Sequence, residues 1–261
     1  MTKLLAIKPE ELLGQSDQHI HYINERVGIN KQMLNAYQAL VDSAQQDGID
    51  IAIASGFRSF ERQRLIWNNK FSGISPIKDV DNNIVDITSL TPIEIVHAIL
   101  LYSALPGASR HHWGCDIDVY ATNLLPKNYQ LKLEPWEYQT SGPLAQLSLW
   151  LTKHAHQFGF YLPYKKYQGG VAAEPWHISY APLAKHYQKA LTTDLLSSCF
   201  EQRCITQSNT SPANTPPANI PPENNEQALL GQNTIQENLT LIMTRYINNT
   251  NAIPDNCYNR A

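Results

Sequence analysis

Two short segments of this chain constrain its fold more than any other feature. One reads Ser-Arg-His-His-Trp-Gly-Cys-Asp-Ile-Asp from Ser109, and the other reads Glu-Pro-Trp-His from Glu174. A hydrolytic zinc needs three nitrogen or oxygen ligands, a fourth position open to water, and a nearby carboxylate that moves protons. His111, Asp118 and His177 can supply the ligands, and Glu174 can supply the base. The chain must then bring two distant segments together around one Zn2+ ion.

The first segment has the pattern of a turn followed by a strand. Residues 117–120 form an alternating, largely apolar stretch that predicts a strand entering a core. Gly114 precedes it, and a residue without a side chain permits the tight turn that folds His111 back toward Asp118. Asp116 lies two residues before Asp118, so both carboxylates share one strand face. Asp118 is the expected ligand, and Asp116 is the alternative.

The second segment needs a bend. Glu174 and His177 would lie on opposite faces of a regular strand, but Pro175 cannot donate to a strand ladder and marks a bend or a strand start. Both side chains could then face one ion. A similar run begins at Glu134, but it has Glu137 where a histidine ligand is needed, so we do not expect metal binding there.

Apolar periodicity predicts both helices and strands along the chain. The predicted helices cover residues 31–47, 60–70, 92–104, 142–157 and a stretch from 181 to about 200. The predicted strands cover residues 49–54, 117–120, 159–162 and a segment that starts near 176. Thr91 and Glu94 form a capping box ahead of the helix at 92. We expect an α+β fold, with helices flanking a small antiparallel sheet and a zinc site in an open cleft.

Composition divides the chain into three parts. Residues 1–200 are expected to form the enzyme domain, which is long enough to bury a core. Residues 201–225 are rich in proline and asparagine and predict a disordered linker. Residues 226–261 hold a C-terminal helix, from 226 to 247, and a tail. We expect this helix to pack on the domain, and binding of a partner is the alternative.

Charge and cysteine content exclude several classes of protein. The net charge is −3 over 261 residues, so no basic excess predicts nucleic-acid binding. The start of the chain lacks the apolar stretch of a secretory signal or membrane anchor, which favours a cytoplasmic protein that does not bind membranes. We also expect a monomer. The 4 cysteines form no CxxC pair, which argues against a structural zinc or a disulfide scaffold.

Three motifs together resemble the VanY-type D-alanyl-D-alanine carboxypeptidases, a family of zinc peptidases that trim peptidoglycan stem peptides and are related to the hedgehog-like zinc fold. The resemblance covers roughly residues 10–195. An upstream Ser-Gly-Phe-Arg-Ser turn contains Arg58 and is followed by Gln63. The other two motifs are Ser-x-His-x-x-Gly-x-x-x-Asp from Ser109 and Glu-x-x-His from Glu174.

The resemblance implies a role for each matching residue. His111, Asp118 and His177 would bind Zn2+. Glu174 would act as general base and acid, and Arg58 would lie beside the scissile carbonyl. Ser109 and Gln63 would hold the substrate, and Trp176 is expected to wall the cleft.

The resemblance also implies a substrate class. The partner would be a peptidoglycan stem peptide or muropeptide from which the C-terminal D-alanine is removed, at a D,D or an L,D bond. Two alternatives have different outcomes: a hedgehog-like zinc-binding interaction domain would not cleave, and a peptidoglycan endopeptidase would cut internal bonds. Glu174 and Arg58 argue against the first alternative, and the absence of a repeated wall-binding module argues against the second.

Overall fold

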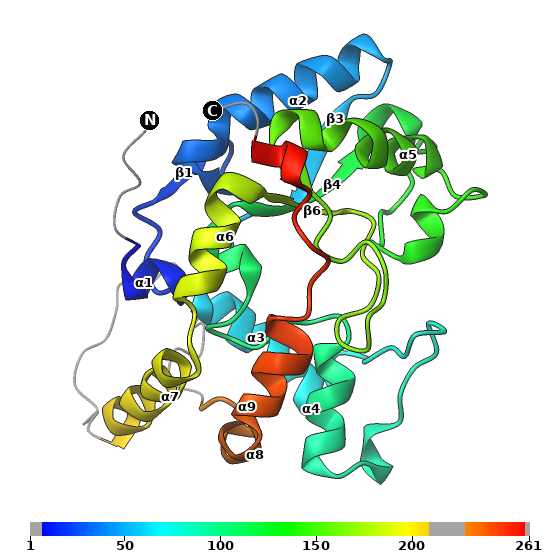
Figure 1. Cartoon of the computed structure of the whole chain (residues 1–261). Helices are drawn as coiled ribbons and strands as arrows, with labels where there is room; N and C mark the ends of the chain where they lie inside the picture. The colour runs from blue at the N-terminus through cyan, green and yellow to red at the C-terminus, as the bar shows by residue number, and fades with distance from the viewer. Residues whose placement is uncertain (1–6, 209–227, 259–261) are drawn as a thin grey trace, which may run out of the picture.

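The computed structural model describes residues 7–208 and 228–258 (Figure 1). Within these residues the central sheet is antiparallel and has the strand order β3-β4-β6-β5. Its strands are β3 (Ile51–Ser55), β4 (Asp116–Ala121), β5 (Phe160–Tyr161) and β6 (His177–Tyr180). A separate hairpin pairs β1 (Ile20–Tyr22) with β2 (Gly28–Asn30). The antiparallel sheet confirms the predicted fold class.

Helices make up most of the remaining regular structure. Those in the first 160 residues are α1 (Pro9–Leu12), α2 (Leu34–Gln46), α3 (Phe60–Phe71), α4 (Pro92–Leu100) and α5 (Ala145–His154). Those that follow are α6 (Ala181–Ala190), α7 (Thr193–Ser208), α8 (Gln232–Glu237), α9 (Leu239–Ile242) and a π-helical turn, Met243–Ile247. Short 3₁₀ turns precede α2 and follow α5, at Lys31–Met33 and Ala155–Phe158.

Most elements differ from the sequence-based expectation at their ends. The stretch predicted as helical from 181 to about 200 is two helices, α6 and α7, and the helix predicted over 226–247 is divided, within the described residues, into α8, α9 and the π-helical turn. Two further boundaries differ for identifiable reasons. The capping box before α4 is present, with the Thr91 backbone N–H donating to Glu94 Oε2 at 2.8 Å, but α4 ends at Leu100. Beyond Leu100 the N–H groups of Tyr102 and Ser103 both donate to the Ile99 carbonyl, so the chain continues as a turn. A proline at 106 then disfavours helical backbone in the residue before it. The strand predicted from residue 49 begins at Ile51, because the Ile49 N–H bonds to the Ala44 carbonyl and closes α2 instead.

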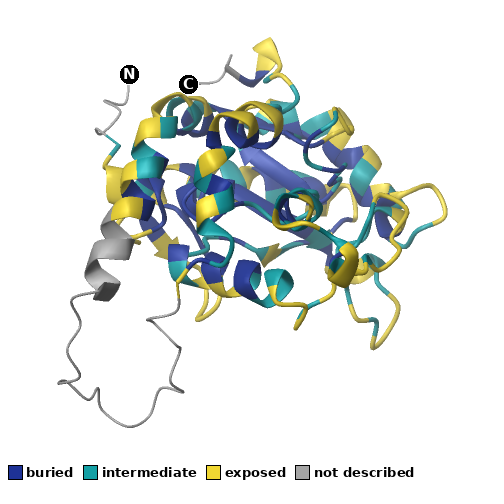
Figure 2. Ribbon diagram, turned by 90° about the horizontal axis from the view of Figure 1, so that it is seen from below, coloured by how far each residue is buried: buried dark blue, intermediate teal, exposed yellow. Residues whose placement is uncertain are grey.

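The sheet lies inside a shell of helices. In Figure 1, α2 lies above β3, β4 and β6 and α5 lies to their right, whereas α3, α4 and α9 lie below them. Figure 2 shows the strands buried beneath half-buried and exposed helical surfaces. No helix within the described residues is both long and apolar enough to cross a membrane.

The C-terminal segment packs against α3. Trp67 Nε1 donates to the Leu230 carbonyl at 3.0 Å. The Asn68 side chain donates to the Ala228 carbonyl and accepts from the Leu230 N–H, at 2.9 and 3.0 Å. Helix α7 continues to Ser208, so the linker predicted from residue 201 begins no earlier than residue 209. The rest of that predicted linker lies outside the described residues.

Candidate active site

The register of two neighbouring strands places two of the predicted ligands. Asp118 on β4 is paired with His177 on β6, and Ser55 on β3 is paired with Asp118 from the other side. Because paired residues of an antiparallel ladder project from the same face, the Asp118 and His177 side chains meet. His177 Nδ1 lies 3.1 Å from Asp118 Oδ1.

A turn brings the third predicted ligand to this pair. His111 lies in the 3₁₀ turn Arg110–Trp113, which ends at Gly114 with φ of 66°. This left-handed backbone favours glycine, as the sequence predicted. The His111 Nδ1 lies 2.9 Å from the Gly56 carbonyl oxygen, so that nitrogen carries the proton. His111 Nε2 is left with a lone pair and lies 3.4 Å from Asp118 Oδ2.

The three side chains fit a metal ion. One ligand atom from each of His111, Asp118 and His177 lies within 4.8 Å of the other two, and all three residues are buried. Asp118 Oδ1 has no hydrogen-bond partner within the described residues, although a buried carboxylate oxygen needs one. Burial lowers the pKa of His111 to about 4, which keeps the imidazole neutral and able to coordinate. Two nitrogens and an oxygen are the donors of a catalytic zinc site.

The neighbouring carboxylates favour a positive charge at the position that the metal ion would occupy. Burial alone lowers the pKa of His177, but its hydrogen bond to Asp116 and the close Asp118 carboxylate outweigh burial and raise it to about 10. Burial alone raises the pKa of Asp118, yet the two histidines hold it at about 2. A bound cation would satisfy the same carboxylate without a proton on the imidazole.

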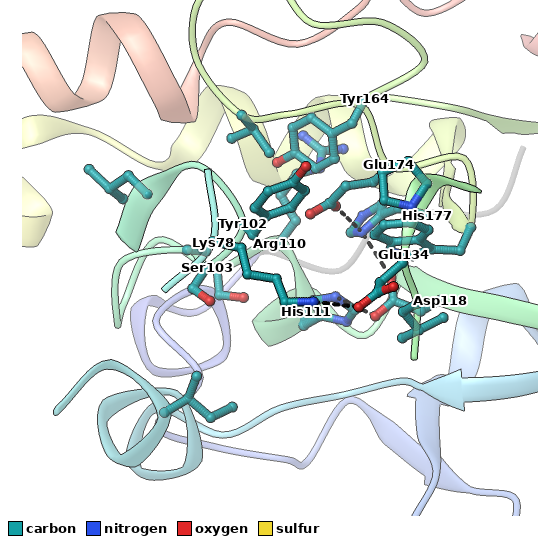
Figure 3. Close-up of a pocket in the computed structure, with 18 of the residues that line it drawn as sticks. Lys78, Tyr102, Ser103, Arg110, His111, Asp118, Glu134, Tyr164, Glu174 and His177 are labelled. Carbon is teal, nitrogen blue, oxygen red and sulfur yellow. Dashed lines mark hydrogen bonds and ion pairs between the residues drawn. The ribbon is translucent and has the colours of Figure 1, made fainter. Parts of the chain in front are cut away.

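Glu174 lies beside the three ligands but makes a different set of contacts (Figure 3). A turn closed by the His177 N–H on the Glu174 carbonyl oxygen brings both side chains to one side, as the proline between them predicted. Glu174 Oε2 lies 3.5 Å from His177 Nδ1. Burial raises the pKa of Glu174 to about 8, against the opposing effect of His177. A carboxylate with a pKa near neutrality can both accept and return a proton.

Arg58 is held at the pocket by two side chains. Its Nη2 donates to Ser55 Oγ at 2.8 Å, and its Nη1 donates to Gln63 Oε1 at 2.9 Å. Gln63 Nε2 in turn donates to the Ala104 carbonyl at 2.7 Å. Gln63 is fully buried and does not line the pocket, because it lies behind Arg58. Its observed contact is with Arg58. Its contact with the substrate stays a prediction.

The pocket has a volume of about 360 Å³ and is lined by every other predicted site residue, including Ser109 and Trp176. Ser109 is buried, and its hydroxyl has no hydrogen-bond partner in the part of the chain that the structure describes. A buried hydroxyl of this kind is suited to bind a ligand group. Trp176 contacts Tyr138 on its other side, with ring centroids 5.6 Å apart.

Several pocket residues were not predicted from the sequence. Lys70, at the end of α3, donates from Nζ to Ser103 Oγ at 2.6 Å. Lys78 and Glu134 form an ion pair across the pocket mouth, so Glu134 has a contact there although it does not belong to the metal cluster. Tyr164 packs edge-on against His177, with ring centroids 5.1 Å apart. Lys70 follows Gln63 by seven residues, a spacing that places both on one face of α3, and this was the available signal for the lysine.

The alternative ligand Asp116 is not one of the three clustered residues. Its Oδ1 accepts from Arg110 Nε at 2.6 Å and from His177 Nε2 at 3.0 Å. His112 adjoins the ligand His111 in the chain but does not line the pocket. Its Nε2 accepts from the Gly107 N–H at 3.0 Å, and burial lowers its pKa to about 3.

Three clustered ligand residues with an adjacent carboxylate and a buried arginine are the groups that a metal-dependent hydrolase requires. Comparison with known proteins specifies the class further. The VanY family model, described as D-alanyl-D-alanine carboxypeptidase, matches residues 26–183. The chain therefore belongs to the VanY family and is a zinc-dependent carboxypeptidase.

Individual proteins show the same similarity. An uncharacterized protein of Haemophilus influenzae is 39% identical over 99 residues, which cover 37% of this chain and 76% of that protein. A D-alanyl-D-alanine carboxypeptidase of Enterococcus faecalis is 24% identical over 180 residues, covering 68% of this chain and 57% of the other. The solved structure of VanYB in complex with D-Alanine-D-Alanine matches with a TM-score of 0.47 and 24% identity, over 71% of this chain and 90% of that chain.

Proposed function

We propose that this enzyme removes the terminal D-alanine from a peptidoglycan stem peptide, with a D-alanyl-D-alanine bond as its preferred substrate. The observation that carries the proposal is the buried set of His111, Asp118 and His177 with Glu174 beside it in one pocket. The family description supports the choice of bond. We also propose that the enzyme acts as a monomer, because the site draws all these residues from one chain.

Each polar residue has a proposed task in hydrolysis. When bound by the three ligands, zinc lowers the pKa of a coordinated water and polarises a carbonyl. Glu174 accepts the proton of the attacking water and later gives it to the leaving amine, which its raised pKa permits. Arg58, fixed by two acceptors, stabilises the negative charge that develops on the carbonyl oxygen.

The terminal carboxylate of the substrate needs a cation within the pocket. Lys70 lines the pocket, and its charge acts on Glu174 together with that of Arg58. We assign the terminal carboxylate of the peptide to Lys70 and the hydroxyl of Ser109 to a neighbouring peptide group. A requirement for a free carboxylate is what distinguishes a carboxypeptidase from an endopeptidase.

Defined peptides test this proposal. Zinc-loaded protein would be incubated with a stem pentapeptide, with the tetrapeptide, and with the pentapeptide carboxamide, and the products identified by mass spectrometry. We expect loss of one D-alanine from the pentapeptide and little cleavage of the carboxamide. Faster cleavage of the tetrapeptide would establish an L,D preference instead.

The same experiment separates the two alternative functions. Cleavage of the carboxamide, or of cross-linked dimers at an internal bond, would identify an endopeptidase. Tight zinc binding without cleavage of any of these peptides would identify a hedgehog-like binding domain. Metal analysis of the purified protein should find about one zinc per chain, as three protein ligands around one open position imply.

A further inference from the structure

A fully buried ion pair, formed by Arg110 and Asp116, adjoins the metal site, and it has no role in the proposed hydrolytic mechanism. Arg110 Nε donates to Asp116 Oδ1 at 2.6 Å, and the two side chains are 3% and 0% exposed. Burying two charges costs several kcal/mol per ion unless their geometry is well satisfied. The pair lies within the first metal-binding motif, where Arg110 precedes one ligand and Asp116 is two residues before another.

The carboxylate of this pair also contacts a metal ligand. Asp116 Oδ1 accepts from His177 Nε2 at 3.0 Å. A hydrogen on Nε2 leaves Nδ1 as the coordinating nitrogen, and Nδ1 is the atom that lies 3.1 Å from Asp118 Oδ1. Strand pairing enforces this arrangement, because Asp116 is paired with Ser179 and Asp118 with His177 on the same two strands.

The guanidinium group that holds Asp116 is itself fixed on several sides. Arg110 Nη2 donates to Tyr161 Oη and to Ser179 Oγ, both at 2.9 Å. Its Nη1 donates to Gln188 Oε1 at 3.3 Å, and its carbon lies 4.7 Å from the centroid of the Trp113 ring. An arginine with this many partners cannot move readily, so the Asp116 carboxylate that it binds is fixed in position and charge.

We propose that Asp116 is a positioning residue that orients His177 and strengthens its Nδ1 as a zinc ligand, and that Arg110 holds Asp116 in place for this task. The inference rests on the proposed metal site. A hydrogen-bonded carboxylate makes an imidazole more basic than a carbonyl partner does. The two histidine ligands therefore differ, because His111 is held by the Gly56 carbonyl oxygen.

The test is the zinc affinity of the full chain, measured without substrate by competition with a chromogenic chelator. Asp116→Asn keeps the size of the side chain and one acceptor oxygen but removes the charge. We expect the zinc dissociation constant to rise about 10- to 100-fold, the usual effect of removing such a partner. The absorption bands of the cobalt-substituted protein should shift as well, because they depend on ligand geometry.

A second variant separates this role from simple structural support. Arg110→Met combined with Asp116→Ala removes both charges together, a change that proteins often tolerate. We expect the double variant to fold and to lose zinc affinity as Asp116→Asn does. Tyr161→Phe is the matched control: it removes one acceptor of Arg110 but leaves the bond between Asp116 and His177, so zinc affinity should not change.

The outcomes distinguish the possible failures. A folded Asp116→Asn protein or double variant with the zinc affinity and cobalt spectrum of the wild type would overturn the positioning role. A fall in unfolding temperature with unchanged zinc affinity would likewise show that the pair is structural. A wild-type protein that binds zinc but cleaves no stem peptide would refute the proposed peptidase activity alone, because the affinity measurement uses no peptide.

Discussion

Glu174 is the residue whose replacement most directly tests the division between ligand and base. It lies 3.5 Å from His177 Nδ1 but is not one of the three clustered ligands. We expect Glu174→Ala to retain zinc and to lower kcat by about 10²- to 10⁴-fold, the usual contribution of general acid–base catalysis. Metal analysis alongside a peptide assay would check this, and loss of zinc together with activity would make Glu174 a ligand.

Arg58 should act mainly on the transition state. Because charge on the carbonyl oxygen develops only during reaction, Arg58→Ala should lower kcat by about 10²- to 10³-fold and change KM less. Gln63→Leu is a second useful variant, because Gln63 contacts Arg58 and does not line the pocket. It should also lower kcat more than it changes KM. A change in KM alone would assign Arg58 to binding of the ground state, contrary to our proposal.

The sequence predicts some individual contacts and not others. The sequence predicted that His111, Asp118 and His177 cluster, because a turn at Gly114 and a bend at Pro175 would bring their side chains to one metal ion. The bond between Asp116 and His177 was not predictable in this way, since it depends on which strand lies beside β4. Lys70 was missed for a similar reason: a lysine near the end of a helix is usually solvated, and its partial burial here depends on the segment that contains Ser103.

At the scale of elements, the turn between the ligands should be sensitive to a single methyl group. A Cβ at Gly114 would collide with Ile20 Cδ1 and lie 3.0 Å from the Asn30 backbone nitrogen, in addition to the cost of its φ of 66°. We expect Gly114→Ala to reduce the free energy of unfolding by about 1–3 kcal/mol or more and to weaken zinc binding through displacement of His111.

Gly48 provides the control for this prediction. Its φ is 77°, and a Cβ there would meet no atom within 4 Å. Gly48→Ala therefore introduces backbone strain without a collision. It should lower the free energy of unfolding by about 1–2 kcal/mol and leave the zinc affinity unchanged. Chemical denaturation and chelator competition would measure both variants. Equal losses of stability with equal zinc affinity would show that the collision is relieved by small movements.

Helices and strands were predicted in type more reliably than in extent. Residues 60–70 and 92–104 were recognisable from apolar spacing, and the capping box marked one start correctly. Their ends were harder to place, because α4 stops at Leu100, where a turn closed on the Ile99 carbonyl follows, and β3 starts only after the N–H of Ile49 closes α2. Local competition for backbone hydrogen bonds decides such boundaries, and the apolar periodicity of the sequence gives no information about that competition.

At the scale of the whole molecule, the C-terminal segment should support the enzyme domain. Asn68→Ala removes both partly buried side-chain bonds to residues 228 and 230 and leaves those backbone groups without these partners. We expect a loss of about 1–3 kcal/mol in the free energy of unfolding, measured by denaturation. Asn69→Ala, on the same helix and half-buried, controls for helix propensity. Equal effects of the two changes would mean that this docking contributes little stability.

The pairing of Asp118 with His177 has a consequence for folding. A slip of one residue between β4 and β6 would turn one of these side chains to the opposite face, and the ion would lose a ligand. Zinc can therefore be retained in full only by molecules whose central strands have paired correctly. The zinc content of a refolded sample would then measure the fraction of molecules in which β4 and β6 have paired in the native register, even where far-UV spectra cannot distinguish the two pairings.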